Sequence, residues 1–441
     1  MSPAGFQSLD DVETGAGLYA LCRRLFPHFR SLTGDGVRAT LADLREVCGL
    51  EVHAVPSGTP ILDWTVPREW KVREAWIAAP DGRRLADVRD CNLHLVGYSA
   101  PFRGRVPLEE LRPRLHSLPD RPDWIPYRTS YWTPTWGFCL PHRVVAALPH
   151  GDYEVRVDTE LFDGEMNWGE LLLPGRRPEE IVITTHICHP SMANDNCSGM
   201  AIAAALAAHF ARRAPTRHAL RFLFMPGTVG AIAWLALHRD VVGHIRYVLV
   251  LAGLGDPGGL TVKHTRYGAD ALDAAAVRVA RRAGRPLREE PFSPYGYDER
   301  QFSSPGFDRP AIVVSRTPFG RYPEYHTSAD NLEFIRPEAL ADSFVYLRDL
   351  VVELDGARVP VNQCPYGEPQ LGRRGLYDAL GGDSHARQRQ MAMLWILNLA
   401  DGRHDIELIR ERAALPAPLF DDALAALERA GLIRWMEDPT P

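Results

Sequence analysis

Apolar residues recur at helical spacing near the start of the chain and then give way to short alternating runs. Between residues 18 and 47, leucine, phenylalanine and valine repeat at helical intervals, which predicts two helices separated by a glycine-containing turn. From residue 56 to about residue 150 the chain is crowded with proline and tryptophan, and turn sequences separate short alternating segments. This stretch predicts a small, mostly β module whose core contains Trp64, Trp70 and Trp76.

After residue 179 the pattern changes to short apolar runs that alternate with longer amphipathic or alanine-rich runs. The predicted strands are 181–185, 220–225, 247–252 and 311–315, and the predicted helices are 198–211, 229–237, 270–283 and 337–354. Such alternation is typical of a mainly parallel sheet that is sandwiched by helices. Functional sites of these α/β folds lie beyond the carboxyl ends of the strands, so the residues that follow each strand are the first candidates.

The C-terminal part predicts a separate module of three short helices and a final strand. These elements are expected at 390–399, 405–413, 420–430 and 432–436, an order that suggests a winged helix. From residue 362 to the end there are nine arginines and twelve acidic residues, whereas a nucleic-acid surface should be basic. We therefore expect this module to serve packing or dimerisation.

Composition excludes several classes of protein. The chain has 441 residues, 50 basic and 56 acidic side chains, a formal charge of −6 and 45% hydrophobic residues, which indicates more than one globular domain. The mild negative charge gives no electrostatic argument for a nucleic-acid or membrane partner. The start shows no secretory signal, no apolar run is long enough to span a bilayer, and the seven cysteines are odd in number and widely spaced. A cytoplasmic protein is expected.

Residues that bind metals follow three of the predicted strands. His186 directly follows the first strand, and His189 and Asp195 lie in the loop before the next helix; Asp256 follows the third strand and His326 follows the last. Each of them alone could belong to an ordinary loop. Together, imidazoles and carboxylates at one edge of a sheet are a donor set that suits zinc. The sequence therefore predicts a metal site.

Two sets of motifs resemble known families. His186, Asp256 and the segments 194–199 and 325–330 resemble the zinc aminopeptidase superfamily that also holds the glutaminyl cyclases. A closer resemblance, to bacterial aminopeptidase-like proteins with an inserted β domain and a C-terminal winged helix, rests on three further blocks. These are 57–59 with 63–70, 126–132 with 136–139, and the HICHPSMANDN run that begins at His186. The resemblance covers nearly the whole chain and implies an aminopeptidase-like catalytic domain at 1–59 and 151–357, an inserted β-rich domain at 60–150 and a winged-helix domain at 362–437.

The resemblance also implies a cocatalytic zinc centre that hydrolyses an amide bond of a small aminoacyl or peptide-like substrate. His186 and Asp256 would hold one ion, Asp195 would bridge, and His326 would hold the other, with a nearby glutamate as general base. His189 competes with His186 for the ligand position; His186 is favoured because it directly follows the strand, and His189 is then expected to contact the substrate.

One departure from the family pattern bears on activity. After the second strand the family has a Pro-Glu-Thr-Ile-Gly-like turn, and here the turn is Pro-Gly-Thr-Val-Gly with Gly227 in place of the glutamate. Glu299 and Glu324 are the candidates to replace it as base, and Asp298 or Glu299 would meet the free amino group of the substrate. We expect one tightly held zinc at His186, Asp195 and Asp256, and a weak or empty second site near His326.

The remaining expectations concern ligands and assembly. Arg128 and Tyr131 of the insert are expected to face the substrate. Subunits could associate as a homo-oligomer through the inserted or the winged-helix domain. An alternative to an enzyme is a binding or scaffold protein that keeps the fold and has lost turnover, which the glycine at position 227 would explain.

Overall fold

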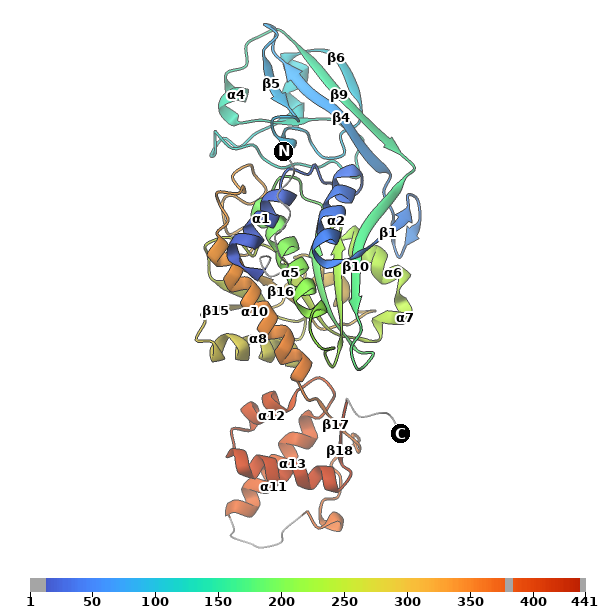
Figure 1. Ribbon diagram of the computed structural model, residues 1–441, viewed down its shortest axis with the longest axis vertical. Helices are drawn as coiled ribbons and strands as arrows, with labels where there is room; N and C mark the ends of the chain where they lie inside the picture. Colours follow the sequence, from blue (N-terminus) through green and yellow to red (C-terminus); the bar gives the residue numbers. More distant parts are fainter. Residues whose placement is uncertain (1–12, 377–383, 437–441) are drawn as a thin grey trace. The chain divides into compact units, whose positions relative to one another are not determined.

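The computed structural model describes residues 13–376 and 384–436. The chain divides into two compact units: Met1–Arg266 with Arg285–Asp349, and Tyr267–Gly284 with Leu350–Pro441. The first unit contains the insert and most of the predicted catalytic domain. The second contains the predicted winged helix together with residues 267–284 and 350–357, which the sequence assigned to the catalytic domain. Figure 1 draws both units and labels many of their helices and strands.

The first unit is built on a mixed eight-stranded sheet with the order β1-β10-β12-β11-β13-β16-β14-β15. The four central strands run parallel to one another, whereas β10 and β14 run antiparallel to their neighbours β12 and β16. The predicted mainly parallel α/β sheet is confirmed in its centre, and antiparallel strands extend it on both sides. The strands are Glu51–Pro56 (β1), Glu165–Leu173 (β10), Glu180–His186 (β11), Ala219–Met225 (β12), Ile245–Leu251 (β13), Leu260–Lys263 (β14), Leu287–Glu290 (β15) and Ala311–Ser315 (β16).

Burial explains the composition of the central strands. Every residue of β11 and β12 is buried, so neither strand alternates apolar and polar residues. β12 is apolar except for Arg221, and β11 is apolar at residues 181–183. Helices flank the sheet, and α1 and α2 pack against α5, which contacts β10 to β13. The helices of this unit include Gly15–Leu25 (α1), Asp35–Cys48 (α2), Gly199–Ala211 (α5), Val229–Leu237 (α6), Arg239–Val242 (α7), Glu299–Phe302 (α9) and Pro337–Gly356 (α10), which continues into the second unit.

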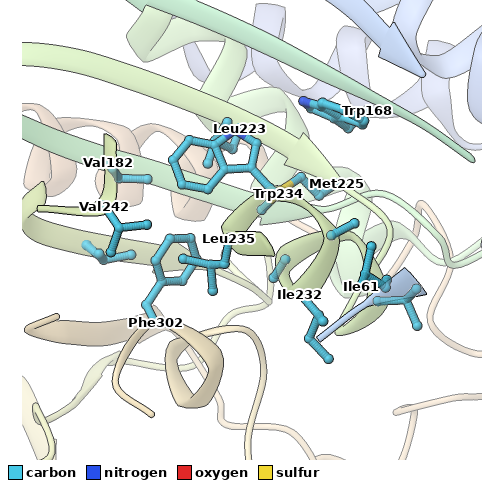
Figure 2. Packing of buried hydrophobic residues seen from close by; sticks show 14 of the residues in the cluster. Ile61, Trp168, Val182, Leu223, Met225, Ile232, Trp234, Leu235, Val242 and Phe302 are labelled. Atoms are coloured by element: carbon cyan, nitrogen blue, oxygen red, sulfur yellow. The ribbon is translucent and has the colours of Figure 1, made fainter. Parts of the chain in front are cut away.

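A cluster of buried hydrophobic side chains packs α6 and α9 against the sheet. Trp234 of α6 is fully buried, and its ring centroid lies 6.2 Å from that of Phe302 of α9. Figure 2 shows these rings among aliphatic side chains of the sheet, Val182 and Leu223 included. This packing fixes the turn between β12 and α6, which contains Gly227.

The insert is a four-stranded antiparallel sheet with the order β5-β4-β9-β6. Its strands are Glu69–Ala78 (β4), Arg84–Asp87 (β5), Phe102–Pro107 (β6) and Asp152–Phe162 (β9). The predicted end of the insert at residue 150 is therefore too early, since β9 pairs along its whole length with β4. Trp70 is buried as predicted, but Trp64 is 38% exposed and contacts the exposed Trp132 edge-on, so Trp64 is not a core residue.

The second unit contains the predicted three helices and a small sheet. Its elements are Ala271–Arg282 (α8), Pro360–Asn362 (β17), Ser384–Leu399 (α11), Ile406–Ala413 (α12), Ala417–Arg429 (α13) and Ile433–Trp435 (β18). Because β17 pairs with β18, this module begins before the predicted residue 362; its predicted last residue, 437, lies outside the described residues. Arg278 of α8 pairs with the buried Asp405, and Arg281 with Glu411. Acidic residues of this module thus serve packing inside the unit.

Among the described residues, no helix combines the length and the apolar composition that crossing a membrane requires.

Candidate metal centre

The candidate site lies where β11 ends, at the carboxyl edge of the parallel strands. His186 is the last residue of β11, and the following loop carries His189 and leads into a tight turn, Ala193–Ser198, before α5. His326 comes from the long loop between β16 and α10 and has a positive φ of 55°. Segments far apart in the sequence therefore meet at this edge, as expected for an α/β fold.

Three imidazoles converge on the carboxylate of Asp195. The His186 Nε2 atom lies 2.9 Å from Asp195 Oδ1, and His189 Nδ1 and His326 Nε2 lie 3.3 Å and 3.1 Å from Asp195 Oδ2. His186 Nε2 and His189 Nδ1 are only 3.1 Å apart. His186, His189 and Asp195 form a group whose ligand atoms all lie within 4.8 Å of one another. The structure thus brings together both candidate histidines of the HICH sequence.

Electrostatics favour the metal-binding forms of Asp195 and His326. Burial raises the pKa of Asp195, but the contacts with His189, His186 and His326 outweigh it and hold the pKa well below its usual range. Burial lowers the pKa of His326, against the opposing effect of Asp195. An ionised carboxylate beside neutral imidazole is the state in which both bind a metal.

Hydrogen bonds hold the turn around Asp195 in place. The Asp330 carboxyl accepts the backbone N–H groups of Asn194 at 2.6 Å and Asp195 at 2.9 Å. The Asn196 amide donates to Thr185 Oγ1 at 2.8 Å and to the Leu251 carbonyl at 3.1 Å. Burial raises the pKa of Asp330 to about 8. Asp330 belongs to a motif noted in the sequence, but nothing in the sequence showed that it supports the Asp195 turn.

Asp256 does not join the group, contrary to the ligand role expected from the sequence. One carboxylate oxygen accepts hydrogen bonds from the Gly258 N–H at 2.8 Å and the Thr317 hydroxyl at 2.6 Å. The other accepts from the Thr317 N–H and the Asn194 side-chain amide, both at 3.1 Å. Since both oxygens are engaged, Asp256 ties the loop after β13 to the loop after β16, and this leaves His189 as the additional candidate ligand.

The insert contributes to the site through one extended segment. The Tyr127 N–H donates to the His326 carbonyl at 2.8 Å, and the Ser328 N–H donates to the Ile125 carbonyl at 2.8 Å. The Tyr127 ring lies edge-on to the rings of His189 and His326, at centroid distances of 5.5 Å and 5.1 Å. This contact was not predicted, because the sequence does not show which β segment reaches the histidines.

A cavity of about 220 Å³ opens beside the histidines. Of the predicted substrate residues, Tyr131 lines it, whereas Arg128 is exposed and lies outside the wall. Of the predicted catalytic residues, only Asp298 lines it; Glu299 is buried and paired with Lys263 at 2.7 Å, and Glu324 is half-buried outside the lining. The wall consists of Leu32, Tyr131, His186, Cys188, His189, Gly227, Thr228, Tyr295, Gly296, Tyr297, Asp298, Arg300, Phe319, Tyr325 and His326.

Comparison with known proteins agrees with this architecture. A family model described as a domain of unknown function, DUF4910, matches residues 19–357, and a winged helix-turn-helix model matches residues 358–435. A protein of Clostridium acetobutylicum, described as a candidate polysaccharide biosynthesis protein with an aminopeptidase-like domain, is 39% identical over 422 residues, which are 96% of this chain and 97% of that protein.

Two solved structures show the same fold. A crystal structure of a candidate peptidase from Clostridium acetobutylicum has a TM-score of 0.79 and 37% identity, and covers 97% of this chain and 98% of that chain. The zinc aminopeptidase BSAP from Bacillus subtilis has a TM-score of 0.58 and 14% identity, and covers 77% of this chain and 95% of that one. At 14% identity the likeness is one of fold alone. The aminopeptidase-like fold predicted from the sequence is confirmed.

Proposed function

The chain belongs to the DUF4910 family and has an aminopeptidase-like fold, and from this premise we propose that it is a zinc-dependent hydrolase of an amide bond. The observation that carries the proposal is the convergence of three imidazoles on the buried Asp195 carboxylate. The relatives' names, which refer to peptidases and to an aminopeptidase-like domain, point in the same direction.

The donor set fits zinc. Asp195 Oδ2 and His326 Nε2 are buried and make no hydrogen bond of acceptable geometry within the described residues, although the two atoms lie 3.1 Å apart. Buried polar atoms without hydrogen-bond partners are rare and call for an explanation such as an ion. Catalytic zinc sites commonly use three protein ligands and keep one position open. We assign His186, His189 and Asp195 as the ligands, with His326 adjacent and able to complete or share the site.

The cavity suits a small substrate with an apolar or aromatic group. Its volume of about 220 Å³ lies below the range of drug-sized pockets. Five of its wall residues are aromatic, namely Tyr131, Tyr295, Tyr297, Phe319 and Tyr325. A zinc ion bound at the histidines would polarise the amide carbonyl and lower the pKa of a water molecule. The Tyr127 ring, packed edge-on against two histidines, would limit water on the insert side. A small aminoacyl or peptide-like compound is therefore the proposed substrate class.

The first test measures metal and turnover together. Protein purified after growth with added zinc should contain about one zinc ion per chain by elemental analysis, and His189→Ala should reduce that content. His142→Ala is a matched control, because His142 lies in a short helix of the insert and bonds to Ser117. The zinc-loaded protein should hydrolyse some members of a panel of aminoacyl anilides.

A second candidate function is a binding or scaffold protein, which the missing carboxylate at Gly227 favours. Tight zinc binding with no turnover on the whole panel would support the scaffold. Absence of both zinc and turnover would contradict the proposed hydrolase and its metal site together.

The contact between the insert and the histidines gives a further prediction. Tyr127→Ala removes the ring that packs against His189 and His326 and leaves the backbone bond to His326 intact. Residues that orient metal ligands typically contribute 10–100-fold to metal affinity, so we expect zinc affinity to fall about 10-fold. Competition with a fluorescent chelator measures this. Tyr366→Ala, at a side chain that is 99% exposed, should leave affinity unchanged, and an equal loss there would contradict the role of Tyr127.

A further inference from the structure

A carboxylate from another part of the chain lies at the turn that lacks one. A Cβ atom at Gly227 would lie 3.5 Å from His186 Cβ and 3.4 Å from Cys188 Sγ, so a side chain there would begin directly beside a ligand. The adjacent residue, Thr228, donates its N–H to Asp298 Oδ1 at 2.8 Å. Asp298 therefore places its carboxyl group against the Gly227 turn from the loop between β15 and β16.

The second oxygen of Asp298 has no hydrogen-bond partner in the described part of the chain. Asp298 is 1% exposed, and its Oδ2 atom makes no hydrogen bond within the described residues. Asp298 also lines the cavity that the histidines line. A buried acceptor without a donor is destabilising, so its presence beside a cavity calls for a role. The cavity supplies the space in which that oxygen can meet a substrate or water.

The backbone around Asp298 is fixed relative to the metal ligands. The preceding residue, Tyr297, stacks on His186 with a centroid distance of 4.9 Å and an interplanar angle of 14°. The Asp298 carbonyl accepts the Gln301 N–H at 2.9 Å. Asp298 is thus held from one side by the His186 stack and from the other by the Thr228 N–H.

The charged groups around Asp298 make proton exchange feasible near neutral pH. Burial raises the pKa of Asp298 to about 7, and Glu299 adds to this, whereas the Thr228 N–H and Arg300 oppose it. Lys263 pairs with Glu299 and limits its effect, and the thiol of Cys188 has its own pKa raised by burial and is neutral. A carboxyl group with a pKa near the working pH is suited to general acid–base catalysis.

Resting on the proposed hydrolase function, we propose that Asp298 is the proton-transfer residue of this site, in place of the carboxylate absent at Gly227. Asp298 Oδ2 accepts a proton from water as the water oxygen bonds to the amide carbon. The same proton passes to the amine nitrogen as the carbon–nitrogen bond breaks, which leaves an acid, an amine and an ionised Asp298. Water supplies the only atoms added, and no oxidant or reductant is required.

The experiment compares zinc-loaded wild type with Asp298→Asn and Asp298→Glu on the aminoacyl anilides that the wild type hydrolyses. General-base catalysis typically contributes ~10²–10⁴-fold, so Asp298→Asn should lower kcat by that factor with KM and zinc content unchanged. Asparagine keeps an oxygen for the Thr228 N–H, so the turn should remain folded. Because the base must be ionised, wild-type kcat should rise with pH through about 7, and this limb should be absent in Asp298→Asn. Asp298→Glu should recover part of the rate.

A double variant tests whether a carboxylate at position 227 can replace the one at position 298. Gly227→Glu introduced into Asp298→Asn supplies a carboxylate from the other side of the turn, and we expect it to recover at least ~10-fold of the lost kcat. The backbone at Gly227 is outside the left-handed region, and the added Cβ makes only ordinary contacts. A readout independent of turnover is difference infrared titration of metal-free protein. A protonated carboxyl band that titrates near pH 7 should be absent in Asp298→Asn, whereas the band of Asp330, whose pKa burial raises to about 8, should remain.

The outcomes separate this inference from the proposed function. Wild-type turnover that persists in Asp298→Asn overturns the proton-transfer role and leaves the hydrolase intact. An effect confined to KM overturns it also, because Asp298 would then hold a substrate ammonium group. Persistence of the infrared band in the variant overturns the assignment of the proton to Asp298. A wild type without turnover on any substrate overturns both proposals.

Discussion

Asp195→Asn should abolish tight zinc binding and reduce hydrolysis to the background rate. Asp195 contacts all three histidines, through Oδ1 to His186 and through Oδ2 to His189 and His326. Asparagine preserves the shape but removes the negative charge that compensates a divalent ion. Loss of residues that only orient ligands costs 10–100-fold in affinity, so loss of this central ligand should cost more than ~100-fold.

Isothermal titration with zinc and kcat/KM on the best aminoacyl anilide measure the two effects of this change. Asp163→Asn is the matched control, because Asp163 has a side chain that is 88% exposed and pairs only loosely with Arg68. The backbone bonds from Asn194 and Asp195 to Asp330 do not involve the altered side chain, so a folded variant is expected. Zinc affinity within a factor of about 10 of the wild type would show that the ion does not bind at Asp195.

Much of this fold could be predicted because the sequence pattern reflects burial. The apolar run at 181–185 became β11, and the helix predicted at 229–237 is α6 with the same bounds. His186 and Asp195 were predicted at one site because a residue at the carboxyl end of a parallel strand has few other places to lie. The long antiparallel strands β9 and β10 were missed for different reasons. In β9 every second residue from 153 to 159 is buried, so its sequence does alternate and this period was overlooked. In β10 residues 166–170 are all buried, so that strand shows no alternation.

The partners of the site residues could not be predicted in the same way. Asp256 after a strand has the same sequence appearance whether it binds a metal or, as observed, accepts hydrogen bonds from Thr317 and Asn194. The deciding donor, Thr317, lies in a loop that is distant in sequence. The role of Tyr127 depends in the same way on a pairing between the insert and the His326 loop. Such long-range contacts leave no local pattern.

At position 227 the sequence and the structure supply different parts of the explanation. The sequence showed that a carboxylate is missing, and it named Glu299 and Glu324 as replacements. The structure pairs Glu299 with Lys263 and brings Asp298 to the turn instead. Restoring the carboxylate alone, in Gly227→Glu, would place two acidic groups against one cavity, and their mutual repulsion would raise the pKa of one of them. The single variant is therefore less informative than the combination with Asp298→Asn.

Arg221→Met should strongly destabilise the first unit. Arg221 lies on β12 and is 7% exposed, and its guanidinium donates two hydrogen bonds of 2.6 Å to Glu180 on β11 and a further one to Glu170 on β10. Removing one partner of a buried ionic network leaves uncompensated charge and typically costs 3–5 kcal/mol. We therefore expect the free energy of unfolding, measured in urea on metal-free protein at pH 7, to fall by about 3–5 kcal/mol.

The pH dependence of that loss tests its cause. Burial raises the pKa of Glu170, but Arg221 and the indole N–H groups of Trp234 and Trp168 outweigh it and hold the pKa below its usual range. A depressed pKa contributes stability above the unfolded value, and that contribution disappears as pH falls through the folded value. The loss of stability caused by Arg221→Met should therefore be largest at neutral pH and shrink below about pH 4.5, the ordinary pKa of glutamate.

The control is Arg73→Met, at an exposed pair with Asp158 and Glu160, which should leave the unfolding midpoint nearly unchanged. A penalty for Arg221→Met that does not depend on pH would mean that lost packing, rather than uncompensated charge, causes the destabilisation.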